Sequence, residues 1–414
     1  MNIIKLAKEN EERLIKYRRH FHRYPELTGK EYETLKFIKQ ELEKYSVEYV
    51  EIENGGILVT IDSGKIGKTV LLRADIDALP IEECQFNDSG IKKPCISENK
   101  GVAHMCGHDC HTAMLLVALQ ILNQHKDKFS GKIFGFFERG EESGENIYYC
   151  LKYFEENNVE YDNCFGIHVG SIVEQELGNI IVRTGEYYAG MIVFDITIHG
   201  KGGHGSRPDL CNNPIDVFVD VVSALRDIEI DKKELFSYST CVVDCGSKCN
   251  IIANTLKFEG SIRFFKEEVA DYFVSEFKKI LQEKSEKYDC TFTEHFKINT
   301  YPVINDELCC EIGRNAFSKL GFNIDEGQPK MGSESFAYLQ MKSDGLYVNL
   351  ITSNAKKGIT AQTHNHKFDV DEDVLYQGVC CHIGYALEFL NGNYQTNRKQ
   401  LNTKALFEKI GINI

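Results

Sequence analysis

The chain has 414 residues, of which 42% are hydrophobic and 27% charged, and its formal net charge is -14 at pH 7. This length allows roughly two or three domains with buried cores of their own. The acidic balance argues against nucleic acid as a partner, because phosphate binding depends on clustered Lys and Arg that release counterions.

The N-terminal segment, MNIIKLAKENEERLIKYRRH, mixes charged and apolar residues at helical spacing. It contains neither the uninterrupted apolar core of a signal peptide nor a span that could cross a bilayer. We therefore expect a cytoplasmic protein without a membrane partner. The 15 cysteines are odd in number and scattered, so most of them are expected to be buried free thiols.

The first part of the chain predicts an α/β domain. A helix is expected through about Tyr45, and the apolar runs GGILVTID and KTVLLRADID then predict strands, the second of which ends near Asp75 and Asp77. After a polar loop, TAMLLVALQILNQH predicts a helix and GKIFGFFERGEES a buried strand, which completes a βαβ unit. Ligands in such sheets bind beyond the carboxyl ends of the strands, where Asp77, Glu141 and Glu142 are expected to lie.

From about Tyr188 the predicted elements follow the order strand, helix, strand, strand, helix, strand. This βαββαβ order is that of the ferredoxin-like fold and predicts an inserted domain over residues 186–298. Residues 1–185 and 299–392 are expected to form the other domain, and 393–414 a polar appendage. The predicted fold class is therefore α/β, with a mixed, mostly parallel central sheet flanked by helices and a smaller βαββαβ domain.

The run CGHDCH could chelate a metal. It places Cys106, His108, Asp109 and His111 two and three residues apart on a loop that leads into a helix. Thiolate and imidazole ligands suit zinc and the later first-row metals. Two alternatives stay open, namely a helix N-terminus with solvated His and Asp beside a core cysteine, and a nucleophilic Cys106 activated by His108.

Further candidate ligands lie on separate loops. Glu141 and Glu142 follow a predicted strand; adjacent carboxylates are usually solvated, but at a cleft one can bind metal while the other accepts a proton from water. His168, in CFGIHVG, is by itself more often a core histidine, and His364 has His366 as a rival in the same loop. Convergence of Cys, His and Glu from several loops is what a site for two metals requires.

Nine motifs follow one another along nearly the whole chain: RRHFHRYPEL, LLRADIDALPI, HMCGHDCHTAML, ERGEESGE, GIHVG, HGKGGHGSRP, CNIIANTLKFEGSIR, MGSESFA and THNHKFDVDED. Together they resemble the aminoacylase-like metallopeptidase superfamily, specifically its branch of N-acyl-amino-acid amidohydrolases, hippurate hydrolases and auxin-conjugate hydrolases. The resemblance implies a metallo-exopeptidase-like fold in which the inserted domain is a lid.

The resemblance also implies a set of site residues. Two divalent metal ions, zinc or manganese, with nickel or cobalt as further options, would be held by Cys106, His108, Glu142, His168 and His364. Glu141 would be the catalytic base, and Asp77 would orient a ligand. In the lid, His204, Asn250 and Arg263 resemble residues that contact the substrate carboxylate or the oxyanion, with His204 often offered across a homodimer formed through the lid.

Three motifs depart from the family pattern. Glu138-Arg139-Gly140 stands where Gln-Pro-Ala is usual before the two glutamates, Ser335 replaces an aspartate, and His366 replaces a proline. These changes bear on substrate preference more than on the metal site.

The predicted function is a metal-dependent amidohydrolase that cleaves small N-acyl amino acids or dipeptide-like substrates by a metal-activated water with a glutamate base. The alternatives are a non-catalytic, metal-dependent binding protein and a Cys106-nucleophile amide hydrolase, and Arg263 could instead form a surface or interdomain salt bridge.

Overall fold

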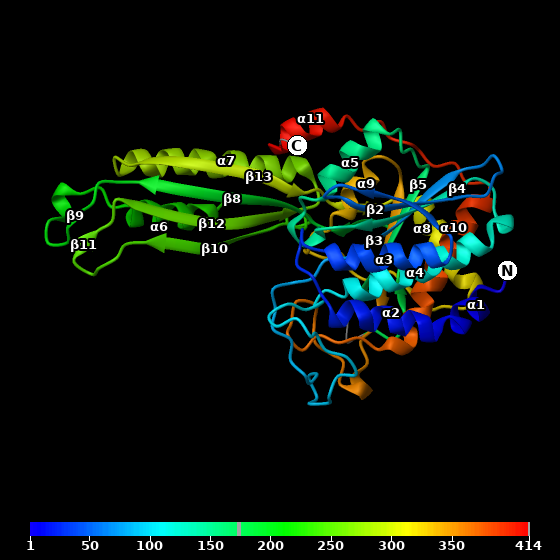
Figure 1. Ribbon diagram of the computed structural model, residues 1–414. Helices are drawn as coiled ribbons and strands as arrows, with labels where there is room; N and C mark the ends of the chain where they lie inside the picture. The colour runs from blue at the N-terminus through cyan, green and yellow to red at the C-terminus, as the bar shows by residue number, and fades with distance from the viewer. Residues whose placement is uncertain (172–174, 413–414) are drawn as a thin grey trace.

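The computed structural model describes residues 1–171 and 175–412 and comprises a rounded body and a long arm (Figure 1). The body is built on an eight-stranded mixed sheet in the order β1-β2-β4-β3-β5-β16-β6-β15, whose central strands β4, β3, β5 and β16 run parallel. The strands are β1 (Glu48–Ile52), β2 (Gly56–Asp62), β3 (Thr69–Asp75), β4 (Lys132–Glu138), β5 (Asn163–Gly170), β6 (Ile180–Ile181), β15 (Ile324–Asp325) and β16 (Gly345–Ile351).

Helices cover both faces of this sheet, so strands such as β3, β5 and β16 are buried along their whole length and read as continuous apolar runs. One face packs against α1 (Ile3–Glu9), α2 (Glu11–Arg23), α3 (Tyr32–Lys44), α4 (His108–Gln124), α8 (Glu307–Lys319) and α10 (Leu375–Asn391). The other face packs against α5 (Ile147–Glu156), α9 (Phe336–Gln340) and α11 (Thr403–Ile410). Short 3-10 turns lie at Lys126–Lys128, Glu141–Ser143, Pro208–Leu210, Ala355–Lys357 and Glu372–Val374.

The arm is the inserted βαββαβ unit, which we call the lid. Its elements are β8 (Gly190–His199), α6 (Pro214–Leu225), β10 (Ser237–Cys245), β12 (Thr255–Phe264), α7 (Glu267–Lys287) and β13 (Thr291–Thr300). The sheet is antiparallel, in the order β10-β12-β8-β13, and has a hydrophobic core of its own beneath the two helices. The predicted fold class is therefore confirmed, whereas the domain boundaries at 185/186 and 298/299 stay predictions.

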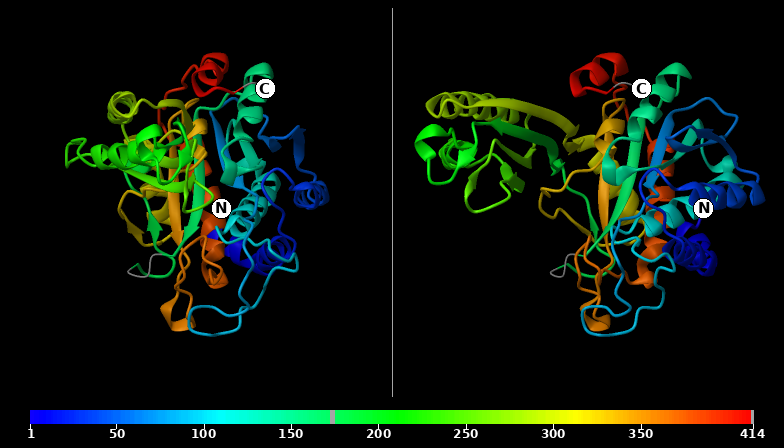
Figure 2. Two further views of the ribbon diagram at one scale, coloured as in Figure 1. Left: turned by 90° about the vertical axis from the view of Figure 1, so that its left-hand side faces the viewer. Right: turned by 60° about the vertical axis from the view of Figure 1, so that its left-hand side comes forward.

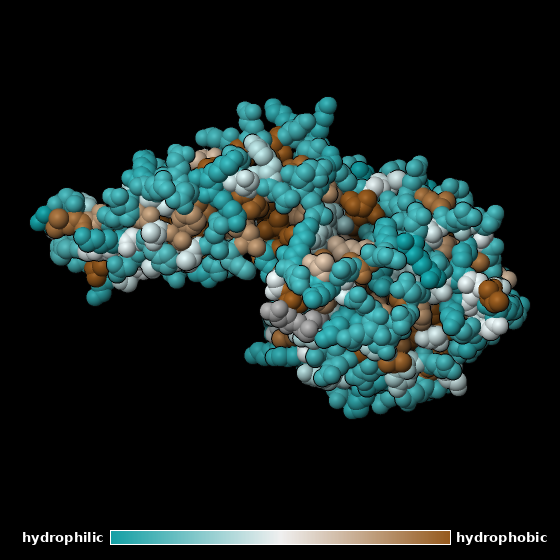
Figure 3. Space-filling view, turned by 90° about the horizontal axis from the view of Figure 1, so that it is seen from above, coloured by the Kyte–Doolittle hydropathy of each residue, from teal (hydrophilic) through white to brown (hydrophobic). Residues whose placement is uncertain are grey.

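The lid joins the body through two neighbouring strands, β8 and β13, next to a ribbon of β7 (Gly185–Tyr188) and β14 (Val303–Asn305). At its far end, β9 (Gly203–His204) and β11 (Ile251–Ile252) form a second small ribbon. The views in Figure 2 show the lid projecting from one side of the body, and Figure 3 shows polar side chains over most of the upper face of both parts.

Two local expectations were wrong. The N-terminal segment is three helices: a first break lies at Asn10, and the chain leaves helical geometry again after Arg23 at Tyr24-Pro25, where a residue before proline disfavours the α conformation. The segment after Gly392 is not simply polar, since α11 buries Leu406, Phe407 and Ile410 against the body, while residues 413 and 414 lie outside the described part. Among the described helices, none is long and apolar enough to span a bilayer.

We expect Phe407→Ala to lower the free energy of unfolding by about 3 kcal/mol, because it empties a site packed edge-to-face against Tyr148. Urea denaturation would measure the change. Lys404→Ala, on the exposed side of the same helix, is the matched control and should stay within about 0.5 kcal/mol of the parent. Equal stability of the two variants would show that α11 adds nothing to the fold.

Candidate metal centre

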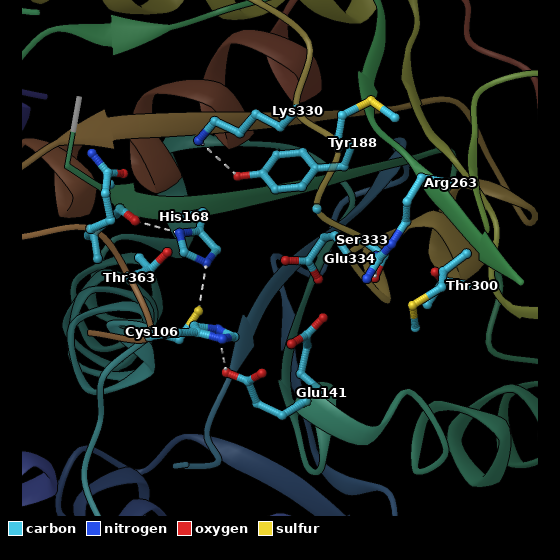
Figure 4. Close-up of a pocket in the computed structure, with 18 of the residues that line it drawn as sticks. Cys106, Glu141, His168, Tyr188, Arg263, Thr300, Lys330, Ser333, Glu334 and Thr363 are labelled. Atoms are coloured by element: carbon cyan, nitrogen blue, oxygen red, sulfur yellow. Dashed lines mark hydrogen bonds and ion pairs between the residues drawn. The ribbon is translucent and has the colours of Figure 1, made fainter. Parts of the chain in front are cut away.

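A pocket of about 770 Å³ lies where the carboxyl ends of the central strands meet the root of the lid. Side chains from both parts of the molecule point into it (Figure 4). Those of the predicted site residues that line it are Cys106, Glu141, Glu142, His168, Arg263 and His364.

The CGHD turn aims its side chains by a backbone conformation that only glycine adopts readily. Gly107 has φ +90°, and an added Cβ there would lie 2.3 Å from a methyl group of Val169. The turn therefore packs directly on β5, with Cys106 before it and His108 at the first position of α4. Cys106 Sγ lies 3.4 Å from His168 Nε2, which faces the pocket because the other ring nitrogen of His168 bonds the Val169 carbonyl.

Asp77 ties two of the predicted ligands together. Its Oδ1 accepts a hydrogen bond from His108 Nδ1 at 3.0 Å, and its Oδ2 accepts one from the backbone N–H of Glu142 at 3.1 Å. Thr28 donates a further hydrogen bond to Oδ2 at 2.6 Å. The carboxylate thus fixes the imidazole so that His108 Nε2 lies toward Glu142, which lines the pocket, as expected of a group that orients a metal ligand.

The donor atoms fit a cation. His108 Nε2 and Glu142 Oε1 are buried 3.8 Å apart, and neither has a hydrogen-bond partner among the described residues. Such atoms are costly to bury unpaired, and a metal would satisfy both. Two groups of three ligand atoms lie within 4.8 Å of one another and share the cysteine: Cys106, His108 and His168, and Cys106, Glu142 and His364. Sulfur, nitrogen and carboxylate oxygen together suit zinc or a later first-row metal.

The structure separates the rival residues of the two His-containing motifs. His364 has φ +64° and places its Nε2 3.4 Å from Glu142 Oε1, whereas His366, which is exposed as His364 is, belongs to none of these groups. His111 uses both ring nitrogens, at 2.6 Å to Asp75 and 2.7 Å to the Val169 N–H. Asp109 pairs with Arg18 at 2.8 Å, beneath the pocket.

The electrostatics of the site disfavour an activated thiol. Burial, followed by the charge of Glu142, raises the pKa of Cys106 well above its usual value, and burial lowers the pKa of His168 well below its own. A nucleophilic cysteine needs the opposite, a thiolate beside an imidazolium. Burial and the neighbouring Glu334 and Glu142 carboxylates raise the pKa of Glu141 well above the usual range, which favours a group that exchanges protons.

The three site residues predicted in the lid do not lie together. Arg263, on β12, lines the pocket and donates a hydrogen bond to Ser333 Oγ at 3.1 Å, and no carboxylate among the described residues pairs with it. His204 and Asn250 are exposed at the far end of the lid, on or beside the β9–β11 ribbon. They do not line the pocket of their own chain, so their contact with a substrate stays a prediction that requires a second chain.

Sequence reasoning missed two groups that shape the pocket. Arg73 is buried in β3 and pairs with Asp75, Glu138 and Glu334 at 2.7 to 3.0 Å. A charged residue inside the apolar run TVLLRAD was the available signal, because a buried charge requires partners. Lys330 and Tyr188 also line the pocket, 3.2 Å apart, but their contact joins distant segments and leaves no local pattern.

Comparisons with known proteins agree with this fold and site, which define a hydrolase of the metallopeptidase class. The chain matches Peptidase family M20/M25/M40 over residues 71–388 and belongs to that family. It is 37% identical to thermostable carboxypeptidase 1 of Saccharolobus solfataricus over 397 residues, 93% of this chain and 97% of the relative. It is 30% identical to N-acetyl-L-cysteine deacetylase of Bacillus subtilis, over 88% and 85% of the two chains.

Among solved structures, a dinuclear metal-binding peptidase of the M20 family from Bacillus subtilis superposes with a TM-score of 0.79. It is 27% identical and covers 93% of this chain and 99% of its own. The resemblance drawn from the motifs is thus confirmed.

Replacing Arg73 by methionine should lower the free energy of unfolding by about 3 to 5 kcal/mol, because it leaves three buried carboxylates without their shared cation. Denaturant unfolding would measure the loss. Arg207→Met is the control, since the exposed Asp209 is the one acidic partner of Arg207 among the described residues, and should cost at most about 1 kcal/mol. A similar small loss in both variants would contradict the role assigned to Arg73.

Proposed function

We propose that this protein is a two-metal amidohydrolase that releases an amino acid with a free carboxylate from a small N-acyl amino acid or dipeptide-like substrate. The observation that carries the proposal is the pair of buried ligand atoms on His108 and Glu142 that have no hydrogen-bond partner among the described residues, beside the Cys106–His168 contact. The dinuclear site named for the Bacillus subtilis structure supports it. Cys106, His108, Glu142, His168 and His364 are the proposed ligands.

When bound, two divalent cations would polarise the amide carbonyl and acidify the attacking water. Glu141 takes a proton from that water and returns it to the leaving nitrogen, so that the C–N bond breaks and a carboxylic acid and an amine form. The Ser335 N–H donates a hydrogen bond to Glu141 Oε1 at 3.1 Å and holds the carboxyl group in place. Asp77 keeps the His108 ring oriented throughout.

Arg263 supports the substrate class. Its guanidinium has no carboxylate partner among residues 1–171 and 175–412, and it lines the same pocket as Glu141. A guanidinium binds the two oxygens of a carboxylate at once. A carboxypeptidase and an N-acetyl-amino-acid deacetylase, which the two relatives are named as, both act next to an amino acid with a free carboxylate. His204 and Asn250 would reach the substrate only from the lid of a partner in a homodimer.

We expect Glu141→Gln to lower kcat by a factor of about 100 to 10,000 and to leave the metal content unchanged, because it removes the proton acceptor but no proposed ligand. Turnover of N-acetyl and N-benzoyl amino acids and metal analysis would measure this. Glu145→Gln is the control, since Glu145 is exposed and pairs with Lys297 outside the pocket. Full activity of Glu141→Gln would refute its role; metal-loaded protein without turnover on any substrate would favour the binding-protein alternative.

Removing metal should abolish activity, and adding back manganese, zinc, nickel or cobalt should restore it. The measurement is turnover after chelation and after titration with each metal, and the metal that restores activity at the lowest concentration is the preferred one. A Cys106-nucleophile enzyme would ignore the chelator. Alkylation is not a suitable control here, because modification of Cys106 would also remove a proposed ligand.

A further inference from the structure

The pocket contains a second cation, Lys330, that the proposed mechanism does not use. Its Nζ donates a hydrogen bond to the Tyr188 hydroxyl at 3.2 Å and lies 5.2 Å from the centre of that ring. No carboxylate of the described chain pairs with it, as is also true of Arg263. The pocket therefore presents two separate cations that lack an anionic partner.

Lys330 is held firmly in this position. The backbone N–H of Lys330 donates a hydrogen bond to the Tyr187 carbonyl at 2.8 Å, and the backbone carbonyl of Lys330 accepts one from the Ala189 N–H at 3.0 Å. The Tyr188 hydroxyl donates to Asn349 Oδ1 at 3.0 Å, so its oxygen is turned to accept from the ammonium. Tyr188 accepts from one of the three N–H groups, and no other residue of the described chain is seen to accept from the ammonium, so the remaining groups can bind a ligand.

Lys330 is partly buried, and removing an ammonium from water is costly without a counterion. Desolvation lowers the pKa of Lys330 to about 8, against an ordinary value of 10.5, and a negative charge on Cys106 would oppose this shift. An unpaired buried charge is offset most effectively by an opposite charge that enters the same space. An anionic group on the substrate would supply that charge each time the pocket fills.

The position of Lys330 indicates which end of the substrate it would meet. In Figure 4, Lys330 and Tyr188 lie above His168, Arg263 and Ser333 lie on the lid side, and Glu141 lies below these two groups. A substrate with its amino-acid carboxylate at Arg263 and its amide beside Glu141 directs its acyl group toward Lys330. A pocket of about 770 Å³ has room for an acyl group longer than acetyl.

We propose that Lys330 binds a carboxylate at the end of the acyl group, so that the preferred substrates are amino acids acylated by a dicarboxylic acid such as succinate or glutarate. This inference rests on the proposed function, because it takes the amide to lie beside Glu141. Lys330 is a specificity-determining residue, and Tyr188 is the positioning residue that orients it.

The test compares N-succinyl-L-alanine with N-butanoyl-L-alanine, which differ in the carboxylate that replaces the terminal methyl group. A hydrogen bond to a charged group corresponds to a factor of about 10 to 100, so the metal-loaded enzyme should favour the succinyl compound by that factor in kcat/KM, mainly through KM. Lys330→Met should abolish the preference, because it should lower kcat/KM for the succinyl compound more than for the butanoyl compound. Lys330→Arg should retain part of it, and Tyr188→Phe should reduce it.

Lys36→Met, at an exposed position on α3, is the matched control and should keep the full preference. Binding of both compounds to the metal-loaded Glu141→Gln protein, measured by calorimetry, separates this inference from the proposed function. Tighter binding of the succinyl compound without turnover by the parent enzyme would support Lys330 and contradict the hydrolase. Turnover without a succinyl preference would overturn the assignment of Lys330.

Two further outcomes would also overturn it. An equal loss on both substrates in Lys330→Met would assign the residue a structural role. A preference for N-butanoyl-L-glutamate over N-butanoyl-L-alanine that disappears in Lys330→Met would place the recognised carboxylate on the amino-acid side.

Discussion

The arrangement of the pocket depends on one buried guanidinium. Arg73 stands in β3 and binds carboxylates from the end of its own strand, from the end of β4 and from the loop before α9. It also donates to Ser335 Oγ at 2.7 Å, and the backbone N–H of Ser335 holds Glu141. Burial raises the pKa of Glu138 to about 7 even beside this cation. The charge of Arg73 and the charges of the carboxylates around it therefore stabilise one another.

Two aspartates at and just after the end of β3, Asp75 and Asp77, have different roles. Asp75 binds His111, whose other ring nitrogen accepts the Val169 N–H, and this chain fixes the end of β5 next to His168. Asp77 instead binds His108 and the backbone of Glu142. The first aspartate supports the scaffold under the site, and the second orients groups that face the pocket. A departure such as Ser335 is accommodated because its hydroxyl joins the Arg73 network.

The sequence predicted those features that depend on local pattern. Continuous apolar runs indicated the central strands, alternation and helical periodicity indicated the lid, and ligand-type residues after strand ends indicated the pocket. The sequence did not predict features that depend on packing between distant segments. The buried face of α11 and the contact of Lys330 with Tyr188 each join segments far apart in the chain, whereas the break after Arg23 had a local signal in Pro25. The strands β8 and β12, each 10 residues long, carry His204 and Asn250 away from the pocket, a distance no motif records.

The attachment of the lid has a mechanical consequence. Both crossings between lid and body lie in adjacent strands, where Met191 of β8 pairs with Thr300 of β13, and both residues line the pocket. A rotation of the lid about this pair changes the width of the pocket at the same place. By thermodynamic linkage, any ligand that binds one lid orientation more tightly also shifts the lid toward that orientation, by the same free energy. A contact at the far end of the lid that favours one lid orientation would therefore also change the affinity of the pocket for its ligand.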